Sequence, residues 1–446
     1  MFHRTVLASA IGLVVSPLLA EEADSTNELQ TIQVIGQAAS VDKALSRQRA
    51  ADNIESTTQA DDIGDFPDSN VSESLQRLPG VSIERDQGEG RFVRVRGVAP
   101  DLNAVKVNGI QVPAPEAGRR AVALDVIPAD LLESLTVVKT LTPDMDGNSL
   151  GGTVEVNTLS AFDRDGLFYS LSGAGSYDDN TEETSPELAV AASNQFSVGD
   201  GEKNFGIAGA VSWGERDFGS DNVETGGAWD FDGGNALEEL EQRDYTITRE
   251  RLGVALNMDY LLNDDTSLYL RTLHSRFRDD EVRQANIFSF ESAQQPGQTG
   301  LVEVEKELKD REETQEINSV VLGGQHYAGD WITDFRVGYS TAEEDEPRHA
   351  DSTVFAAEFP DGGFTGTRKP SALYPTGFYD DANYELDEVE ETEGKTTDKQ
   401  GDLALDFTRQ LYWNNNPASI KFGTKISQRE KDSDVNVWIY EPDAVL

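Results

Sequence analysis

The second half of the chain contains long runs in which apolar and polar residues alternate. Residues 252–260 and 331–340 alternate at nearly every position, and similar runs occupy residues 205–213, 403–411 and 420–426. A period of two residues predicts β-strands with one apolar face and one wet face, here of roughly 9–13 residues. The wall of a membrane barrel and a soluble β-sandwich would both show this pattern.

Connection lengths distinguish these two architectures. Short connections near residues 199–203, 263–265, 329–330 and 414–417 alternate with long ones near residues 178–187, 216–244, 279–316 and 341–400. Membrane barrels have short periplasmic turns and long outer loops, whereas structureless loops of this size are uncommon in compact soluble domains. We therefore predict a mainly β protein, a transmembrane antiparallel β-barrel with long extracellular loops.

The number of strands bears on whether this barrel is complete. About nine strands fit between Leu167 and Arg429, and a tenth is predicted to start at Val435. Bacterial single-chain barrels have an even number of strands and no open edge in lipid. Residues 161–446 are therefore expected to form part of a larger barrel, truncated here, with further strands beyond Leu446.

Residues 61–160 have a different, compact α/β pattern. A helix is predicted over Ser69–Arg77, with Ser69 or Asn70 as its cap and Pro79-Gly80 at its end. Strands are predicted at residues 81–85, 92–96, 104–107 and 135–139, with Asn108-Gly109 as a tight turn. A small independent domain is the natural interpretation.

The first 60 residues contain two features. Residues 1–20 resemble an export signal, because His3 and Arg4 precede a short apolar run. Residues 21–60 are polar except for Leu29–Gly36, which predicts a lone strand in a flexible tail. A strand without a neighbour can pair with another chain by β-augmentation. The alternative is a disordered leader with an accidental apolar run.

Composition excludes several classes of function. The formal net charge of −45 opposes nucleic-acid binding, which needs a concentrated basic surface. The chain has no cysteine, and its four histidines are scattered, so neither a metal cluster nor histidine or cysteine catalysis is expected. We predict no catalytic residues, no metal site and no cofactor, and hence a protein that is not an enzyme.

Four motifs in the small domain are more specific. They are SESLQRLPGVSIERDQGEGRFVRVRG (72–97), VNG (107–109), IPADLLESLTVVK (127–139) and SLGGTVEVNT (149–158). In this order they closely resemble the plug domain of TonB-dependent receptors. The resemblance implies a plug at 61–160 in the lumen of a barrel that has 22 strands when complete. It also implies that the strand in the tail is a TonB box at residues 31–36, formed by Thr31, Ile32, Gln33, Val34 and Ile35.

The resemblance also suggests roles for four arginines. Arg94 and Arg96 of the VRVRG motif are expected to pair with barrel glutamates, because guanidinium groups form bidentate, breakable links to carboxylates. The alternative is two solvated strand residues. Arg119 and Arg120 are weaker candidates for contact with an anionic substrate, and surface solvation is the alternative for them.

The implied function is uptake across a Gram-negative outer membrane. The receptor would bind a scarce extracellular substrate, and TonB with its inner-membrane energising complex would pull on the box from the periplasm. A signal-transducing receptor and a non-enzymatic surface binding protein or adhesin are the alternatives. The substrate stays open between a ferric siderophore or other iron complex and an oligosaccharide. Residues 341–400 hold 16 acidic and 5 basic residues, which disfavours a highly anionic cargo.

Overall fold

The computed structural model describes residues 37–59, 70–232, 234–414 and 416–442. The export signal and the strand predicted at Leu29–Gly36 lie outside these ranges. No helix in the described part of the chain is long and apolar enough to cross a membrane.

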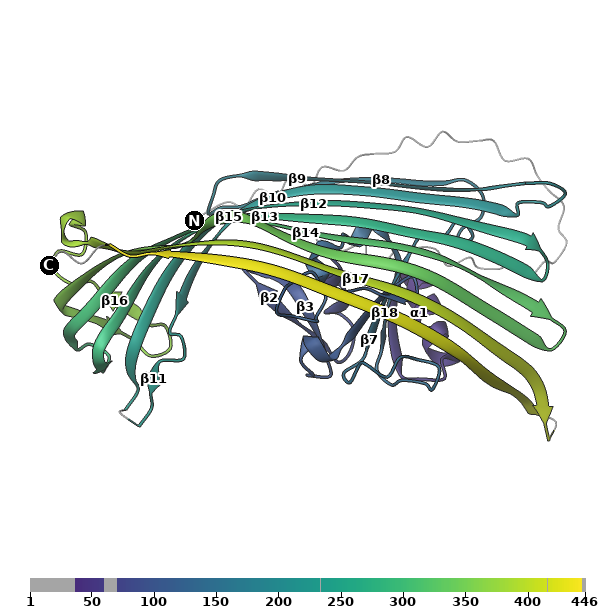
Figure 1. Ribbon diagram of the computed structural model, residues 1–446, viewed down its shortest axis with the longest axis horizontal. Coiled ribbons are helices and arrows are strands. Elements are labelled where there is room, and N and C mark those ends of the chain that lie inside the picture. Colours follow the sequence, from purple (N-terminus) through teal and green to yellow (C-terminus); the bar gives the residue numbers. More distant parts are fainter. Residues whose placement is uncertain (1–36, 60–69, 233, 415, 443–446) are drawn as a thin grey trace, which may run out of the picture. The chain divides into compact units, whose positions relative to one another are not determined.

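The small domain predicted from the sequence is present (Figure 1). Its sheet has the order β1-β6-β7-β4-β5, in which only β4 and β7 run parallel, and β2 and β3 form a separate hairpin. The elements are α1 (Gln37–Ala50), β1 (Glu55–Gln59), α3 (Val71–Leu75), β2 (Val81–Asp86), β3 (Glu89–Val95), η1 (Pro100–Leu102), β4 (Ala104–Val107), β5 (Ile110–Gln111), η2 (Leu124–Val126), η3 (Ala129–Leu131), β6 (Leu132–Val138) and β7 (Thr153–Thr158).

Local signals of this domain were predicted well. Asn70 caps α3 by accepting a hydrogen bond from the Glu73 backbone N–H, as its short polar side chain allows. Asn108 and Gly109 have φ values of +50° and +86° and join β4 to β5, which is the geometry of a type I′ turn. Each predicted strand overlaps an observed one.

The domain begins earlier than predicted, which corrects the assignment of residues 21–60 to a flexible tail. Helix α1 and strand β1 lie within this segment, and β1 pairs with β6 from Glu55↔Val138 to Gln59↔Ser134. The sequence of β1, ESTTQ, has no apolar alternation, because an edge strand can be held by backbone hydrogen bonds alone. Its polarity made it look like part of the tail.

The second half forms one antiparallel sheet, so the mainly β fold class is confirmed. Its order is β18-β17-β15-β14-β13-β12-β10-β9-β8, with β11 paired to β12 and β16 to β15. The elements are β8 (Phe168–Tyr177), β9 (Thr184–Phe196), β10 (Phe205–Glu224), β11 (Trp229–Asp230), β12 (Ala236–Asn263), β13 (Thr266–Gln294), β14 (Thr299–Ala328), β15 (Trp331–Thr365), β16 (Ser371–Leu373), η4 (Asp381–Asn383), β17 (Glu385–Trp413) and β18 (Asn416–Tyr440).

The long connections were predicted wrongly as loops. Residues 279–316 are mostly strand, since β13 and β14 continue until only 295–298 separate them. Val435, the predicted start of a tenth strand, lies inside β18. The cross-strand pairing continues through these segments, although charged residues interrupt their apolar alternation. The short turns were placed correctly, near 264–265, 329–330 and Asn414.

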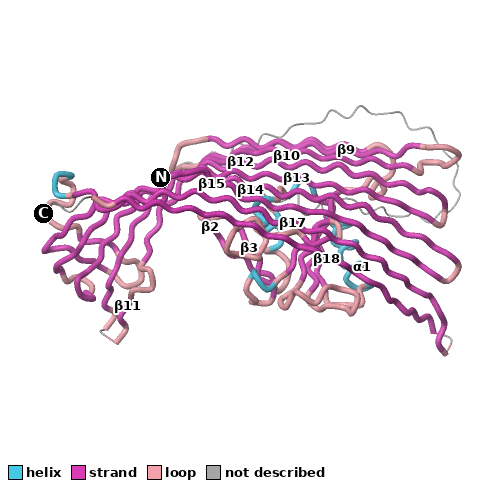
Figure 2. Tube along the Cα trace, in the orientation of Figure 1, coloured by secondary structure: helices cyan, strands magenta, loops and turns pink. Residues whose placement is uncertain are grey.

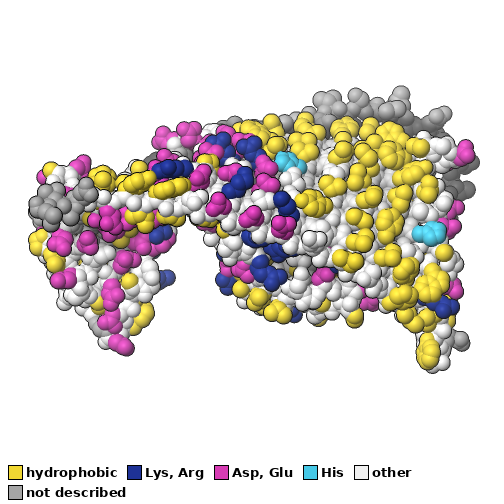
Figure 3. All heavy atoms as spheres, viewed as in Figure 1, with side chains coloured by type: hydrophobic (Ala, Val, Ile, Leu, Met, Phe, Trp, Pro, Cys, Tyr) yellow, Lys and Arg dark blue, Asp and Glu magenta, His cyan; other side chains and the backbone are white. Residues whose placement is uncertain are grey.

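The outward face of the sheet is apolar toward its short-turn end. Exposed apolar side chains gather there (Figure 3), among them Val320, Leu322, Val337, Tyr339, Leu403, Ile420 and Phe422. The hairpins at the opposite end have a separate apolar core around Phe288, Phe364 and Phe378.

The small domain packs against the opposite, inner face of the sheet (Figure 2). One apolar cluster includes Leu131 and Val126 from the domain and Phe277 and Ile317 from the sheet. The contact is close at Gly253 of β12, where a β-carbon would lie 2.5 Å from Leu131 Cδ1. The inner face of the sheet is therefore where the two parts of the molecule meet.

Candidate functional site

A buried carboxylate on the small domain meets three arginines of the sheet. Glu89 begins β3 directly after the turn at Gln87-Gly88, and its side chain is 3% exposed. It lies 2.9 Å from Arg249 Nη1 and 2.5 Å from Arg251 Nη2, and it also pairs with Arg216. Since Arg216 belongs to β10 and Arg249 and Arg251 to β12, one carboxylate joins the domain to two strands.

This Glu89 cluster extends deeper into the sheet. Arg249 Nε lies 3.0 Å from Asp279 Oδ1, and both side chains are fully buried. Gln87 donates a hydrogen bond to Glu281 and accepts one from Arg249. Burial alone would raise the pKa of Glu89, but the nearby Arg251, Arg249 and Arg216 outweigh it and hold the pKa well below its usual range. Glu89 is therefore a charged group whose place depends on the arginines.

A second buried ion pair joins the domain to β14. Arg91 lies 2.7 Å from Glu116 and 3.1 Å from Asp86 within the domain, and 3.1 Å from Glu313 of the sheet. Arg311 of β14 also pairs with Glu313 at 3.0 Å. The result is a chain of alternating charges that crosses the interface.

A cavity of about 580 Å³ lies beside Arg91, between the domain and the sheet. Its charged lining consists of six carboxylates and four guanidinium groups: Glu84, Asp86, Glu116, Glu313, Glu344 and Glu346, with Arg85, Arg91, Arg119 and Arg311. Phe92 adds an aromatic surface, over which Arg119 lies at 4.3 Å from the ring centroid. Such a lining can accept hydrogen bonds from hydroxyl or ammonium groups and offers an aromatic face for stacking.

Among the described residues, Arg94 and Arg96 make their contacts within the small domain, and their pairing with barrel glutamates stays a prediction. Arg94 pairs with Glu84 on the neighbouring strand β2, on the exposed side of the hairpin. Arg96 has a φ of +56° and donates to the backbone carbonyls of Leu150 and Gly151. Both arginines therefore hold the small domain together, and Glu89 and Arg91 of the same strand make the contacts with the sheet.

Arg119 and Arg120 differ in their position. Arg119 lines the cavity but is paired with Asp101 at 3.0 Å, which leaves less of its charge for an anionic ligand. Arg120 donates through its backbone to Asp101 and through its side chain to Asn148 O at 3.4 Å, outside the cavity lining. Contact with a substrate stays a proposal for Arg119 and is not supported by position for Arg120.

The sheet arginines were not found from the sequence. Arg249 and Arg251 occupy inner positions of a strand whose following inner positions are small, such as Gly253 and Ala255. Two arginines on the same face of a predicted strand, followed by small residues on that face, were the only feature of the sequence that could have indicated an interface here. The carboxylate that they bind, Glu89, lies about 160 residues away, and only the fold brings these residues together.

Comparison with known proteins gives the family of the small domain. Residues 47–153 match the family model described as the TonB-dependent receptor plug domain. The chain carries the plug domain of a TonB-dependent receptor. The match begins inside α1, in agreement with a plug that starts before residue 61.

Solved structures give more distant similarities. The ferric enterobactin receptor PfeA from Pseudomonas aeruginosa is 10% identical, with a TM-score of 0.39 over 83% of this chain and 71% of that one. The ferric preacinetobactin receptor BauA from Acinetobacter baumannii is 11% identical, with a TM-score of 0.38 over 87% and 61%. The outer membrane transporter YddB from Escherichia coli is 9% identical, with a TM-score of 0.35 over 84% and 77%. No curated protein matches the sequence.

Asp125 of the plug leads to a prediction about pH. It lies in η2 with 1% exposure, and its Oδ1 has no hydrogen-bond partner among the residues that the structure describes. Burial raises its pKa to about 6 against the opposing effect of Arg91, Arg251 and Arg249. A raised carboxyl pKa means that the folded state binds the proton more tightly than the unfolded state, so this contribution to stability is lost as pH rises from about 4 to about 6.

We expect Asp125→Asn to raise the free energy of unfolding at pH 8 by up to about 3 kcal/mol, since one pKa unit corresponds to about 1.4 kcal/mol. At pH 4 the variant should differ from the wild type by less than about 1 kcal/mol, because Asp125 is then protonated in the folded state and about half protonated in the unfolded state. Urea unfolding of the detergent-solubilised chain at both pH values measures this difference. A variant that is less stable than the wild type at pH 8 would contradict the assignment of a destabilising charge.

Proposed function

We propose that this protein is an outer-membrane receptor that imports an extracellular substrate into the periplasm by TonB-driven movement of its plug. The observation that carries the proposal is a plug that is held on the sheet by buried ion pairs and hydrogen bonds in addition to an apolar cluster, beside a cavity with a polar lining. A permanent structural domain would be held more simply by apolar packing, because buried ion pairs contribute little net stability. Ion pairs and hydrogen bonds between the plug and the sheet can be exchanged for contacts with water and formed again.

The path of force would begin at the TonB box, Thr31–Ile35, which lies outside the described residues. TonB would pair with this segment as an added strand, a mode of recognition that depends on backbone hydrogen bonds. The first described elements after the box are α1 and the edge strand β1. A pull toward the periplasm would therefore act first on α1 and then on β1 and its pairing with β6.

The charges in the cavity support a class of cargo. Glu116, Glu344 and Glu346 contribute to an excess of carboxylates over guanidinium groups, and the hairpin residues 341–400 are acidic as well. This field opposes a highly anionic cargo and suits a neutral or cationic one that is rich in hydroxyl groups. A neutral oligosaccharide fits this description, and so does an iron complex without excess negative charge.

Growth on single sources of iron or carbohydrate tests the proposal. Cells with the intact gene and cells without it are compared on each source, and the comparison is repeated in a strain that lacks TonB. We expect one source to require both the receptor gene and TonB. A source that requires the receptor gene but not TonB would argue for a binding protein or adhesin.

A further inference from the structure

The plug meets the sheet in two different ways. On β10 to β14 the contact is largely apolar, outside the buried ion pairs described above. The sheet residues in the shared apolar cluster on these strands are Ala208, Ala210, Ala255, Leu273, Phe277 and Ile317. Separating the plug from this side would expose apolar surface to water, which is unfavourable in proportion to its area.

On β15 and β18 the sheet holds the plug through hydrogen bonds to backbone carbonyl groups, together with apolar contacts of Gly338 with Ile110 and of the buried Ala342. Arg336 donates to Gly109 O at 2.8 Å, and Ser340 donates to Gln111 O at 2.9 Å. Lys431 donates to three plug carbonyls, including Arg119 O at 2.9 Å. Water can replace a cation or hydroxyl as the donor to a carbonyl oxygen, so these contacts can be exchanged without leaving a polar group unpaired.

Two partly exposed ion pairs also join β18 to the plug. Lys421 lies 2.5 Å from Asp144, and Lys425 lies 2.8 Å from Asp146. Partly exposed pairs of this kind contribute little to stability and weaken further with salt. These contacts exchange with water more readily than the buried ion pairs of Glu89 with β12.

The inner faces of β17 and β18 are polar, and β15 adds polar residues on either side of Gly338 and Ala342, which pack against the plug. In strands the same face carries every second residue, and Asp334↔Asp406 and Ala404↔Lys425 are opposite pairs in the sheet. The polar residues on this face are Asp334, Arg336, Ser340, Glu344 and Glu346 of β15, Asp398, Gln400, Asp402 and Asp406 of β17, and Lys425, Ser427, Arg429 and Lys431 of β18. Acidic side chains on β17 face basic ones on β18, as in the pair of Arg429 with Asp398 at 2.9 Å.

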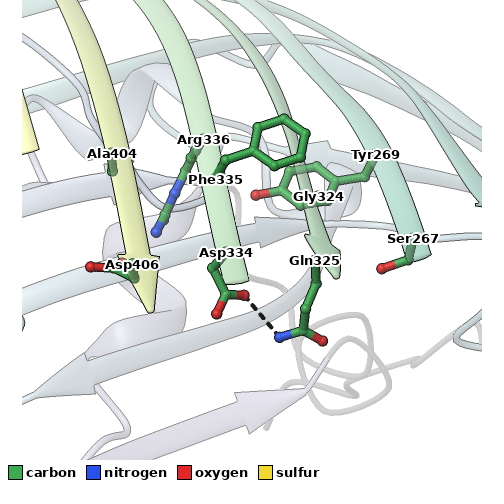
Figure 4. A pocket seen from close by; sticks show the side chains of 9 residues that line it. All are labelled: Ser267, Tyr269, Gly324, Gln325, Asp334, Phe335, Arg336, Ala404 and Asp406. Carbon is green, nitrogen blue, oxygen red and sulfur yellow. Dashed lines mark hydrogen bonds between the residues drawn. The ribbon is translucent and has the colours of Figure 1, made fainter. Parts of the chain in front are cut away.

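A cavity lies at each end of this polar surface. Glu344 and Glu346 line the cavity of about 580 Å³ described above. A second cavity of about 230 Å³ lies toward the short turns and is lined by Asp334, Arg336 and Asp406 (Figure 4). On β15 the two linings are about eight residues apart, which corresponds to roughly 27 Å along a strand.

We infer that the passage opened by plug movement runs along the inner faces of β15, β17 and β18, from the larger cavity to the smaller one. This inference rests on the proposed function. It adds the strands along which the cargo passes and the chemical class of cargo that these strands can bind. Alternating acidic and basic groups provide donors and acceptors along the whole route. They suit an uncharged, hydroxyl-rich cargo, which exchanges its hydrogen bonds with water for hydrogen bonds with the wall. Arg336 closes this route at rest by holding the plug turn at Gly109.

Single cysteines can locate the passage, because the wild-type chain has no thiol. Three matched alanine-to-cysteine variants are made in the full-length receptor. Ala404→Cys lies on β17 in the smaller cavity, Ala208→Cys lies on β10 under the plug, and Ala117→Cys lies exposed in the larger cavity. Cells are treated from outside with fluorescein-5-maleimide, with and without a protonophore, and the rate of labelling is measured. Leakage of the reagent through other pores is equal in both conditions.

We expect Ala404→Cys to label severalfold faster in energised cells, Ala208→Cys to stay unlabelled, and Ala117→Cys to label equally in both conditions. Energy-dependent labelling of Ala208→Cys, alone or together with Ala404→Cys, would overturn the inferred route while leaving energy coupling intact. Equal labelling of each variant with and without the protonophore would overturn the route together with the coupling on which it rests.

Discussion

Replacing Glu89 by alanine is expected to weaken the seating of the plug by about 3–5 kcal/mol, the typical cost of leaving a buried charge without its partner. The variant leaves Arg251, which is 8% exposed, without its carboxylate partner, whereas the fully buried Arg249 keeps its pair with Asp279. Urea titration of the full-length receptor, with hydrogen exchange of the β3 amides as the readout, measures this loss. The amides report the plug directly, whereas overall β content would be dominated by the sheet.

Glu84→Ala is the matched control for this prediction. Glu84 is a glutamate on the paired strand β2, and its partner Arg94 is 45% exposed. Removal of a surface pair of this kind changes stability by about 0–1 kcal/mol. Equal losses for Glu84→Ala and Glu89→Ala would show that the Glu89 cluster does not hold the plug.

A second variant distinguishes the loss of the ion pair between Glu89 and Arg251 from the cost of leaving Arg251 buried without a partner. Arg251→Met removes one buried guanidinium and keeps much of the side-chain volume. Combined with Glu89→Ala, it should recover part of the stability, because neighbouring residues in one ionic network are not additive. A fully additive double variant would mean that these two residues do not act on each other.

The plug was predictable where its signals are local. The cap at Asn70 and the turn at Asn108-Gly109 depend on residues a few positions apart, so their chemistry could be read directly. Strand β1 could not be read in this way, since its place is set by β6, about 80 residues later. The outer parts of β13 to β17 were missed because charged residues interrupt the alternation there, while their buried apolar residues form the separate cluster around Phe288 and Phe364.

At the interface between plug and sheet the structure brings together residues other than the two arginines for which barrel partners were predicted. Arginines were expected on the plug and glutamates on the sheet, whereas the largest cluster has Glu89 on the plug and arginines on the sheet. Strand β3 carries Glu89, Arg91 and Arg94 within six positions, and the sequence does not say which face of the strand meets the sheet. The pairing of β3 with β2 determines which face of β3 meets the sheet. Arg94 lies opposite Ser82 and pairs with Glu84 on the exposed face, so Glu89 and Arg91 lie on the other face.

Replacing Ile32 by proline is expected to abolish energy-coupled uptake while leaving binding of the cargo at the cell surface intact. Proline removes a backbone donor and fixes φ near −65°, so a strand that must pair with TonB through its backbone loses both a hydrogen bond and its geometry. Ile32→Val is the control, because it keeps the backbone donor and a β-branched side chain. The cavity residues of the plug and sheet are distant in sequence from the change.

The measurement is growth on the source that requires the receptor, together with retention of that cargo by whole cells at low temperature. We expect Ile32→Pro to prevent growth and to retain cargo like the wild type, and Ile32→Val to behave like the wild type in both assays. Growth of the Ile32→Pro strain at the wild-type rate would show that residues 31–35 are not the segment on which TonB pulls, even if the plug and its Glu89 cluster behave as described.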